Sequence, residues 1–120
     1  MKVLLSICLP VVSVIGIYSQ SWKLVWFDEF NAKGTPDAAT WDYEKGYVRN
    51  KELQNYTSNK KNILIQNGLC IIEAHKEKDQ TITSASIHTF GKKDFLYGRI
   101  EIRAQIPTGL GTWPALWLLG

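Results

Sequence analysis

A chain of 120 residues, 45% hydrophobic and 21% charged, is long enough for one modest globular domain. The formal net charge is only +3, and the lysines lie in scattered pairs such as Lys60-Lys61 and Lys92-Lys93. Because a nucleic-acid-binding surface needs a denser basic stripe, we expect no nucleic-acid partner.

The N-terminus has the pattern of a secretory signal peptide. Lys2 supplies a positive charge, Val3 to Ile17 form an apolar run, and small Ser19 is a suitable cleavage position. The run is shorter than the roughly 20 residues of a membrane-spanning helix, so an uncleaved anchor is the less favoured alternative. We expect residues 1–19 to be a signal peptide and residues 20–120 to form the working domain. The protein is then secreted, extracellular or periplasmic, with no membrane span after cleavage.

The rest of the chain predicts an all-β domain, because short apolar or alternating runs are separated by turn residues and no helical periodicity lasts three turns. Asn67-Gly68 between two such runs predicts a tight hairpin. Strands at this spacing are typical of an antiparallel sandwich or barrel. The expected strands are Leu24 to Phe30, Asn62 to Gln66, Leu69 to His75, Ile82 to Thr89 and Tyr97 to Ile106, followed by an apolar run from Trp113 to Leu119.

The clearest alternation lies between Tyr97 and Ile106. Ile100, Ile102 and Ile106 would face one side of a strand, and Arg99, Glu101 and Arg103 the other. We therefore expect one face on the core and one in water. Cys70 is the cysteine that remains after removal of the signal peptide, and its apolar surroundings predict a small core residue without a disulfide.

Two groups of residues suggest a carbohydrate surface. Trp113 and Trp117 would share one face of a strand, about 13 Å apart, and flat indole rings stack on sugar rings. Two core tryptophans would have the same spacing. The segment Gly46 to Thr57 concentrates amide, Arg, Glu and Tyr side chains, which match the donors and acceptors of sugar hydroxyls. An ordinary polar loop would have the same composition.

The acids show no catalytic arrangement. Glycoside hydrolysis needs two carboxyl groups that flank the scissile bond. Glu77-Lys78-Asp79 lies in a predicted polar turn, and Asp28-Glu29 are adjacent, so they point to opposite faces of a strand. The histidines have no nucleophile at a recognisable spacing, and no cluster has zinc-ligand spacing. We predict no catalytic residue in this chain.

Several motifs together resemble glycoside hydrolase family 16, the laminarinases and related β-glucanases. They are Leu24 to Asn31, Trp41 to Glu44, Glu52 to Thr57, Asn67 to Leu69, Thr83 to Ala85, Tyr97 to Arg103 and Gly111 to Gly120. The resemblance implies a β-jelly-roll, concanavalin A-like sandwich of two curved antiparallel sheets, with only its N-terminal part present here. It also implies a glycan cleft on the concave face.

The resemblance also implies site residues. Trp113 and Trp117 would line the cleft, and Asn50 and its neighbour Arg49 would contact sugar. Ser86 stands where the family often has Arg, so one sugar contact is missing and the substrate is correspondingly in doubt. No organic cofactor is expected. Many members hold a structural Ca²⁺, for which Glu29 and Gly68 would supply ligands here, although binding by these residues alone should be weak.

The function implied is a retaining endo-β-glucanase acting on β-1,3 or mixed-linked glucan, monomeric when full length. The family's catalytic acids come as E-x-D-x-x-E or E-x-D-x-E on the strand after W-P-A-x-W, and Gly120 precedes that strand. We therefore expect this chain to be inactive alone. The alternatives are a non-catalytic glycan-binding or recognition module and a fragment without function.

Overall fold

The computed structural model describes residues 21–120, so the predicted signal peptide and Cys8 lie outside the described residues. Within this range the chain forms seven strands and no helix, which confirms the predicted all-β class. Accordingly, these residues include no helix long and apolar enough to cross a membrane. The strands are β1 (Asp42–Tyr43), β2 (Gln54–Tyr56), β3 (Ile63–Gln66), β4 (Leu69–Ile72), β5 (His75–Lys76), β6 (Ile82–Ser84) and β7 (Ile87–His88).

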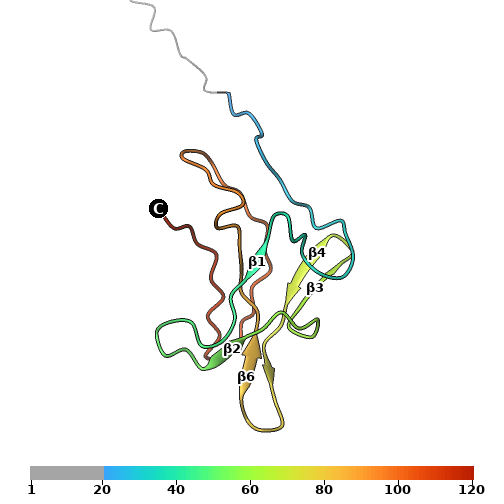
Figure 1. The fold of residues 1–120 in the computed structure, drawn as a ribbon, viewed down its shortest axis with the longest axis vertical. Helices are drawn as coiled ribbons and strands as arrows, with labels where there is room; N and C mark the ends of the chain where they lie inside the picture. The colour runs from blue at the N-terminus through green and yellow to red at the C-terminus, as the bar shows by residue number, and fades with distance from the viewer. Residues whose placement is uncertain (1–20) are drawn as a thin grey trace, which may run out of the picture.

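The strands form three small sheets in the lower and central part of Figure 1. β3 pairs with β4, β1 pairs with β7, and β6 lies between β2 and β5. All pairs are antiparallel except β2 and β6, which run parallel. The expectation of a purely antiparallel arrangement is wrong for this pair, because β2 and β6 are separated by the whole β3–β4–β5 excursion and are not joined by a hairpin turn.

Two of the predicted strands are split in the structure. The run from Leu69 to His75 divides at Glu73-Ala74 into β4 and β5, and the run from Ile82 to Thr89 divides at Ala85-Ser86 into β6 and β7. In both cases the two halves pair with strands of different sheets. Apolar patterning identifies extended backbone but carries no signal for the point where a chain changes sheets.

The β3–β4 hairpin is formed as predicted. Its register pairs Ile63 with Ile72 and Gln66 with Leu69, and Asn67-Gly68 make the turn. Both turn residues have positive φ, 54° and 73°, which is what a tight two-residue hairpin turn requires. Asn tolerates this conformation and Gly adopts it freely, so the local sequence determines the turn.

The core is centred on β3. Ile63 and Ile65 are 0% and 2% exposed, and Ala85, between β6 and β7, is 7% exposed. Asn62, which is also completely buried, joins three segments through its side chain. It accepts a hydrogen bond from Thr57 Oγ1 (2.6 Å) and donates to the Glu73 carbonyl and Thr83 Oγ1 (both 3.1 Å). Buried polar groups persist when they are bonded in this way.

The predicted first strand, Leu24 to Phe30, is not a strand in the structure. Its aromatic residues pack instead against segments distant in sequence: Trp26 lies 6.0 Å from Trp41 and 5.9 Å from Phe95 between ring centroids. Phe30 stacks on Trp41 at 5.9 Å, and Trp41 Nε1 donates to the Asp28 carboxylate at 2.7 Å. Side-chain packing therefore fixes this segment without a sheet partner.

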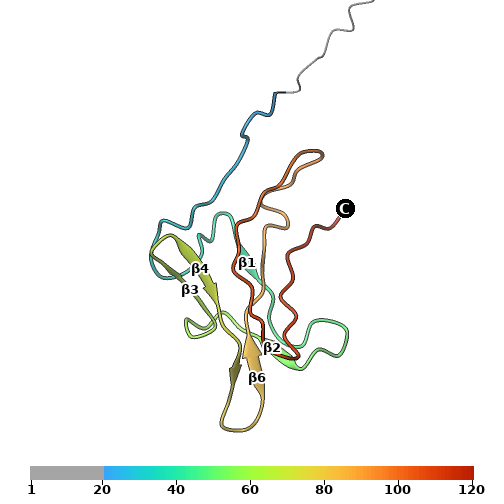
Figure 2. The ribbon, with the colours of Figure 1, turned by 180° about the vertical axis from the view of Figure 1, so that it is seen from behind.

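The long strand predicted at Tyr97 to Ile106 is also absent, and so is a strand at Trp113 to Leu119. Figures 1 and 2 show the part of the chain after β7, residues 89–120, as extended chain that turns back on itself beside the sheets. Ile100, Ile102 and Ile106 are 48%, 58% and 58% exposed, so the predicted core face is not buried. The alternation fixes which side chains share a face, but a strand also needs a neighbouring backbone to pair with, and none of the described residues supplies one.

Candidate functional site

Five side chains from four separate segments meet in what we call the polar–aromatic cluster: Glu44, Arg49, Tyr56, Ser86 and Trp117. Glu44 is at its centre, where one carboxylate oxygen forms an ion pair with Arg49 and the other accepts a 2.6 Å hydrogen bond from Ser86 Oγ. The guanidinium carbon of Arg49 lies over two rings, 5.2 Å from the Trp117 centroid and 5.9 Å from the Tyr56 centroid. Both distances are within the range of a cation–π contact.

The backbone brings these side chains together through short-range pairing. Gly46 and Tyr56 exchange two backbone hydrogen bonds of 3.0 and 2.9 Å, which closes the loop that carries Arg49. The Glu44 amide donates to the Ser86 carbonyl at 3.1 Å, just beyond the β1–β7 pair. The loop therefore presents Arg49 directly to the carboxylate of Glu44.

The tip of the loop is a tight turn. Glu52 N donates to the Arg49 carbonyl at 3.1 Å, and the two residues between them, Asn50 and Lys51, both have φ of 54°. Positive φ at both central positions is the pattern of a type I′ turn, in which Asn is favoured and Lys is unusual.

The electrostatics favour the charged forms of both partners. Partial burial would raise the pKa of the Glu44 carboxyl, but the hydrogen bonds from Ser86 and Arg49 and the positive charge of Arg49 outweigh burial and hold the pKa below its ordinary value. The hydrogen bond to Glu44 likewise raises the pKa of Arg49. Glu44 is thus a fixed anion that orients Arg49, and it has no proton to supply as an acid at neutral pH.

A second hydrogen-bonded group adjoins the cluster on β2. Gln54 Nε2 donates to Tyr56 Oη at 2.8 Å and to Glu52 Oε2 at 3.0 Å, and Tyr56 Oη donates to the same Glu52 oxygen at 3.0 Å. Burial is the main reason that the pKa of Tyr56 lies above its ordinary value. The amide, phenol and carboxylate are held in one arrangement, and all three groups are of the kind that bind sugar hydroxyls.

The structure brings together some of the predicted sugar-binding residues. Arg49 and Trp117 are in contact, and Asn50 is exposed at the adjacent turn. Trp113 is 92% exposed and Trp117 53%, so neither is a core residue. Because residues 113–119 do not form a strand, the argument that placed the two rings on one strand face does not hold for this structure.

Sequence reasoning did not single out Glu44 or Tyr56, and it named Ser86 only as the position of a missing sugar contact. Tyr56 lay within the polar segment that was considered as a whole, and Glu44 and Ser86 lay within or beside quoted motifs. The missing signal is spatial, since Glu44 and Ser86 are 42 residues apart in sequence.

Most acidic side chains are engaged in local structure. Glu77 pairs with Lys61 and accepts from Thr83 Oγ1 at 2.6 Å, within the predicted polar turn. Nine of the eleven acids have a hydrogen-bond or ion-pair partner of this kind, namely Asp28, Asp37, Asp42, Glu44, Glu52, Glu73, Glu77, Asp79 and Glu101.

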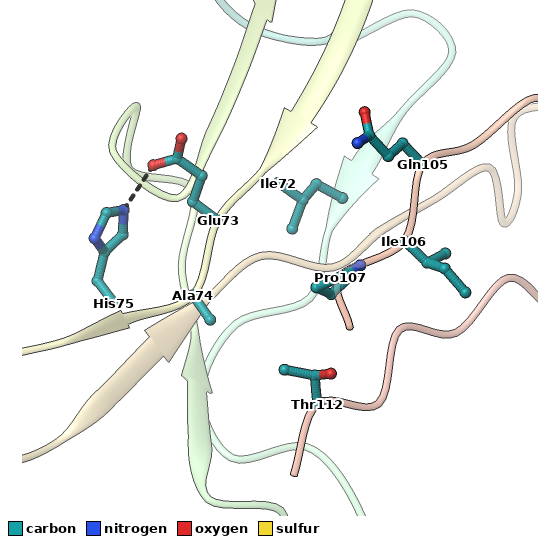
Figure 3. Close-up of a pocket in the computed structure, with 8 residues that line it drawn as sticks. All are labelled: Ile72, Glu73, Ala74, His75, Gln105, Ile106, Pro107 and Thr112. Carbon is teal, nitrogen blue, oxygen red and sulfur yellow. Dashed lines mark hydrogen bonds and ion pairs between the residues drawn. The ribbon is translucent and has the colours of Figure 1, made fainter. Parts of the chain in front are cut away.

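An open hollow of about 520 Å³ lies elsewhere, between β4–β5 and the segment around Ile106 (Figure 3). Its walls include Ile72, Ala74, Ile106 and Pro107, and Glu73 and His75 form a 3.0 Å pair at its edge. None of its lining residues is aromatic apart from the imidazole of His75, and it contains none of the predicted site residues. A sugar-stacking surface needs flat rings, so this hollow is not the candidate site.

The two residues predicted as calcium ligands do lie side by side. A Cβ placed on Gly68 would be 3.7 Å from the Glu29 carbonyl oxygen and 3.9 Å from Asn31 Oδ1. Calcium needs six to eight oxygen ligands, and residues 21–120 contain no group of three or more His, Cys, Asp or Glu side chains placed to hold a metal.

Known proteins with similar sequences were found by comparison, although no protein-family profile matches the chain. A β-glucanase of Rhodothermus marinus is 48% identical over 103 residues, which cover 82% of this chain and 36% of that protein. The glucan endo-1,3-β-glucosidase A1 of Niallia circulans is 37% identical over 116 residues, covering 81% of this chain and 17% of that protein. The chain thus spans about a third or less of these curated relatives.

Solved structures of glucanases are also similar to this chain. The laminarinase of Rhodothermus marinus superposes with a TM-score of 0.60 at 43% identity, over 65% of this chain and 33% of that one. SCLam, a non-specific endo-β-1,3(4)-glucanase from family GH16, gives a TM-score of 0.58 at 37% identity, over 63% of this chain and 34% of that one. The chain belongs to glycoside hydrolase family 16. The resemblance drawn from the motifs is confirmed, and the fold is part of the family 16 β-jelly-roll.

One similar protein is named for binding. A stretch of 38 residues is 47% identical to the β-1,3-glucan-binding protein of Penaeus monodon, covering 32% of this chain and 10% of that protein. Family 16 similarity therefore extends both to proteins named as hydrolases and to a protein named as a binder.

Proposed function

We propose that the protein to which this chain belongs is a secreted endo-β-glucanase of family 16, and that these residues supply part of its glucan-binding surface. The substrate class is β-1,3-linked or mixed-linked glucan, and the protein acts as a monomer. The observation that carries the proposal is the polar–aromatic cluster, in which an exposed indole, a fixed guanidinium and bonded amide and phenol groups lie together. Aromatic faces beside oriented polar groups are what a sugar polymer requires.

The relatives support the chemistry. The two relatives matched over most of this chain that are described above are named as a β-glucanase and a glucan endo-1,3-β-glucosidase. A retaining mechanism would use one carboxylate as nucleophile and a second carboxyl as acid and then base, about 5–5.5 Å apart. Because nine of the eleven acids here already have structural partners, we propose that the catalytic pair is not among these residues and that the chain alone is inactive.

The binding part of the proposal is tested by affinity electrophoresis in gels containing laminarin, a soluble β-1,3-glucan. We expect the chain to be retarded and Trp117→Ala to abolish most of the retardation, since the ring is 53% exposed and free to stack. Trp22→Ala, which removes a 59% exposed indole outside the cluster, is the matched control and should behave as wild type. Equal migration in gels with and without laminarin would contradict the proposal.

The catalytic part is tested with reducing-end assays on the chain and on a longer protein that contains it. The chain should release no reducing ends, whereas the longer protein should release them from laminarin. Proton NMR during the first turnovers should show the β-anomer of the product, as retention requires. Cleavage by the 120 residues alone, or release of the α-anomer, would refute the assignment.

The second candidate function is non-catalytic glucan recognition, which the similarity to a β-1,3-glucan-binding protein favours. It makes a different prediction for the longer protein: retardation by laminarin without any release of reducing ends. The same pair of assays therefore separates a hydrolase from a recognition module. A chain without either function would form aggregates in place of a cooperatively unfolding monomer, because its exposed apolar residues are numerous.

Export is proposed from the apolar run and small Ser19 at the N-terminus. Expression in a secreting host followed by N-terminal sequencing should give a mature protein that starts at Gln20. A protein that keeps Met1 and stays with the cells would contradict this.

A calcium ion held by Glu29 and Gly68 with ligands from elsewhere in the protein also stays a prediction.

A further inference from the structure

Arg49 is held on several sides within the polar–aromatic cluster. Its guanidinium forms an ion pair with Glu44 and lies over the rings of Trp117 and Tyr56, at 5.2 and 5.9 Å from their centroids. Only 26% of its side chain is exposed. A free surface arginine is mostly solvated and mobile, so an arginine held in this way has a defined place and orientation.

Trp117 lies in a segment that has no strand pairing of its own. Residues 113–120 make no backbone hydrogen bond within the described part of the chain. The orientation of the indole ring is therefore set by side-chain contacts, and the guanidinium of Arg49 is the charged group that faces it. Since 53% of Trp117 stays exposed, the contact leaves much of the ring accessible to a ligand.

We propose that Arg49 is a positioning residue, which holds the Trp117 indole in the orientation that stacks on a glucan ring, and that Glu44 with Ser86 holds Arg49. This deepens the proposed function and rests on it, because it presupposes that Trp117 binds glucan. It differs from the sequence-based prediction, in which Arg49 contacts the sugar directly.

The chemistry of the guanidinium group supports this series of side-chain contacts. A planar guanidinium can stack on an indole face and at the same time donate in its own plane to a carboxylate, which a lysine ammonium cannot do. Glu44 has both oxygens occupied, one by Arg49 and one by Ser86, so its carboxylate plane is fixed. This series of side-chain contacts, from Ser86 and Glu44 through Arg49 to Trp117, therefore links β1–β7 to the C-terminal segment, which has no strand pairing of its own.

The first test needs no ligand. The indole N–H signals of the tryptophans are recorded by ¹H–¹⁵N NMR, and Trp117→Phe assigns the Trp117 signal. Arg49→Gln should shift and broaden that signal while leaving those of Trp26 and Trp41 in place, which also shows that the fold persists. Arg99→Gln, which removes an exposed arginine paired with Glu101, is the matched control and should change nothing. An unchanged Trp117 signal in Arg49→Gln would overturn the proposal.

The second test measures laminarin affinity in a double-mutant cycle. We expect Arg49→Gln to weaken binding roughly fivefold to tenfold, which is the size of a partly exposed cation–π contact. The same change in the Trp117→Ala background should have no further effect. An equal loss in both backgrounds would mean that Arg49 is a direct sugar ligand and not a positioning residue.

Two further outcomes keep the proposals distinct. Glu44→Gln should reproduce the NMR change of Arg49→Gln more weakly, and Arg49→Lys should not restore binding, because the ammonium keeps the charge but cannot stack as a plane. If Trp117→Ala leaves laminarin binding intact, the proposed function fails at this residue while the NMR result still decides whether Arg49 orients the ring.

Discussion

We predict that replacing Asn62 by Ala strongly destabilises the protein. The side chain is completely buried and makes three hydrogen bonds, to Thr57, Glu73 and Thr83. Each bond contributes a net of about 1 kcal/mol, and its loss leaves a partner group without a bond in a dry site. We therefore expect the free energy of unfolding to fall by about 3 kcal/mol.

The measurement is urea unfolding followed by tryptophan fluorescence and circular dichroism, whose transitions must coincide for the free energy to be meaningful. Asn55→Ala is the matched control. Asn55 is half-buried in β2 and makes no side-chain hydrogen bond within the described residues, so its replacement should change the free energy by less than about 0.5 kcal/mol. A loss below about 1 kcal/mol for Asn62→Ala, or an equal loss for the control, would refute the view that Asn62 joins the three segments.

Three other predictions follow from burial and charge. Ile65→Ala, at a side chain 2% exposed, should lower the free energy of unfolding by about 2–5 kcal/mol, while Leu53→Ala, at one 75% exposed, should stay within about 0.5 kcal/mol in the same urea series. The hydrogen bond from Ser86, the hydrogen bond and charge of Arg49 and, last, the charge of His88 depress the folded pKa of Glu44. The stability that the ionised Glu44 contributes is therefore complete above the ordinary carboxyl pKa of about 4.3 and is lost as the pH falls through the folded pKa. Wild type should therefore keep its advantage over Glu44→Gln down to about pH 4.3 and lose it as the pH falls further, and a difference in unfolding free energy that stays constant over this range would count against this. Burial raises the pKa of the Cys70 thiol to about 11, so alkylation at pH 8 should be more than about a hundredfold slower in the folded protein than in urea, and similar rates in both would show that the thiol is accessible.

The sequence correctly predicted features that depend on neighbouring residues. The Asn67-Gly68 turn forms between β3 and β4 because both residues accept positive φ. The Glu77 to Asp79 segment forms a turn, closed by the backbone hydrogen bond from Gln80 N to the Glu77 carbonyl. The all-β class followed from the spacing of short apolar runs. Family membership followed from motifs in a fixed order and was confirmed by similarity to family 16 glucanases.

The sequence was misleading where structure depends on a distant partner. The alternation in Tyr97 to Ile106 predicted a strand, but the structure has no pairing there, and the isoleucines that should be buried are about half exposed. Leu24 to Phe30 had a similar pattern, yet it is fixed by the packing of Trp26 and Phe30 around Trp41. Alternation describes the faces of one segment, whereas a sheet requires two backbones at the correct distance.

The residue types of the candidate site were determined by the sequence alone: an arginine and amide-rich loop, and tryptophans near the C-terminus. Only the tertiary structure decided that Arg49 lies over Trp117 and that Glu44 and Ser86, 42 residues apart, hold it from the other side. Local turns and strand tendencies come from short-range sterics, which a sequence displays directly. Contacts between segments depend on how the whole chain closes on itself, and the sequence shows only which side chains are suited to make them.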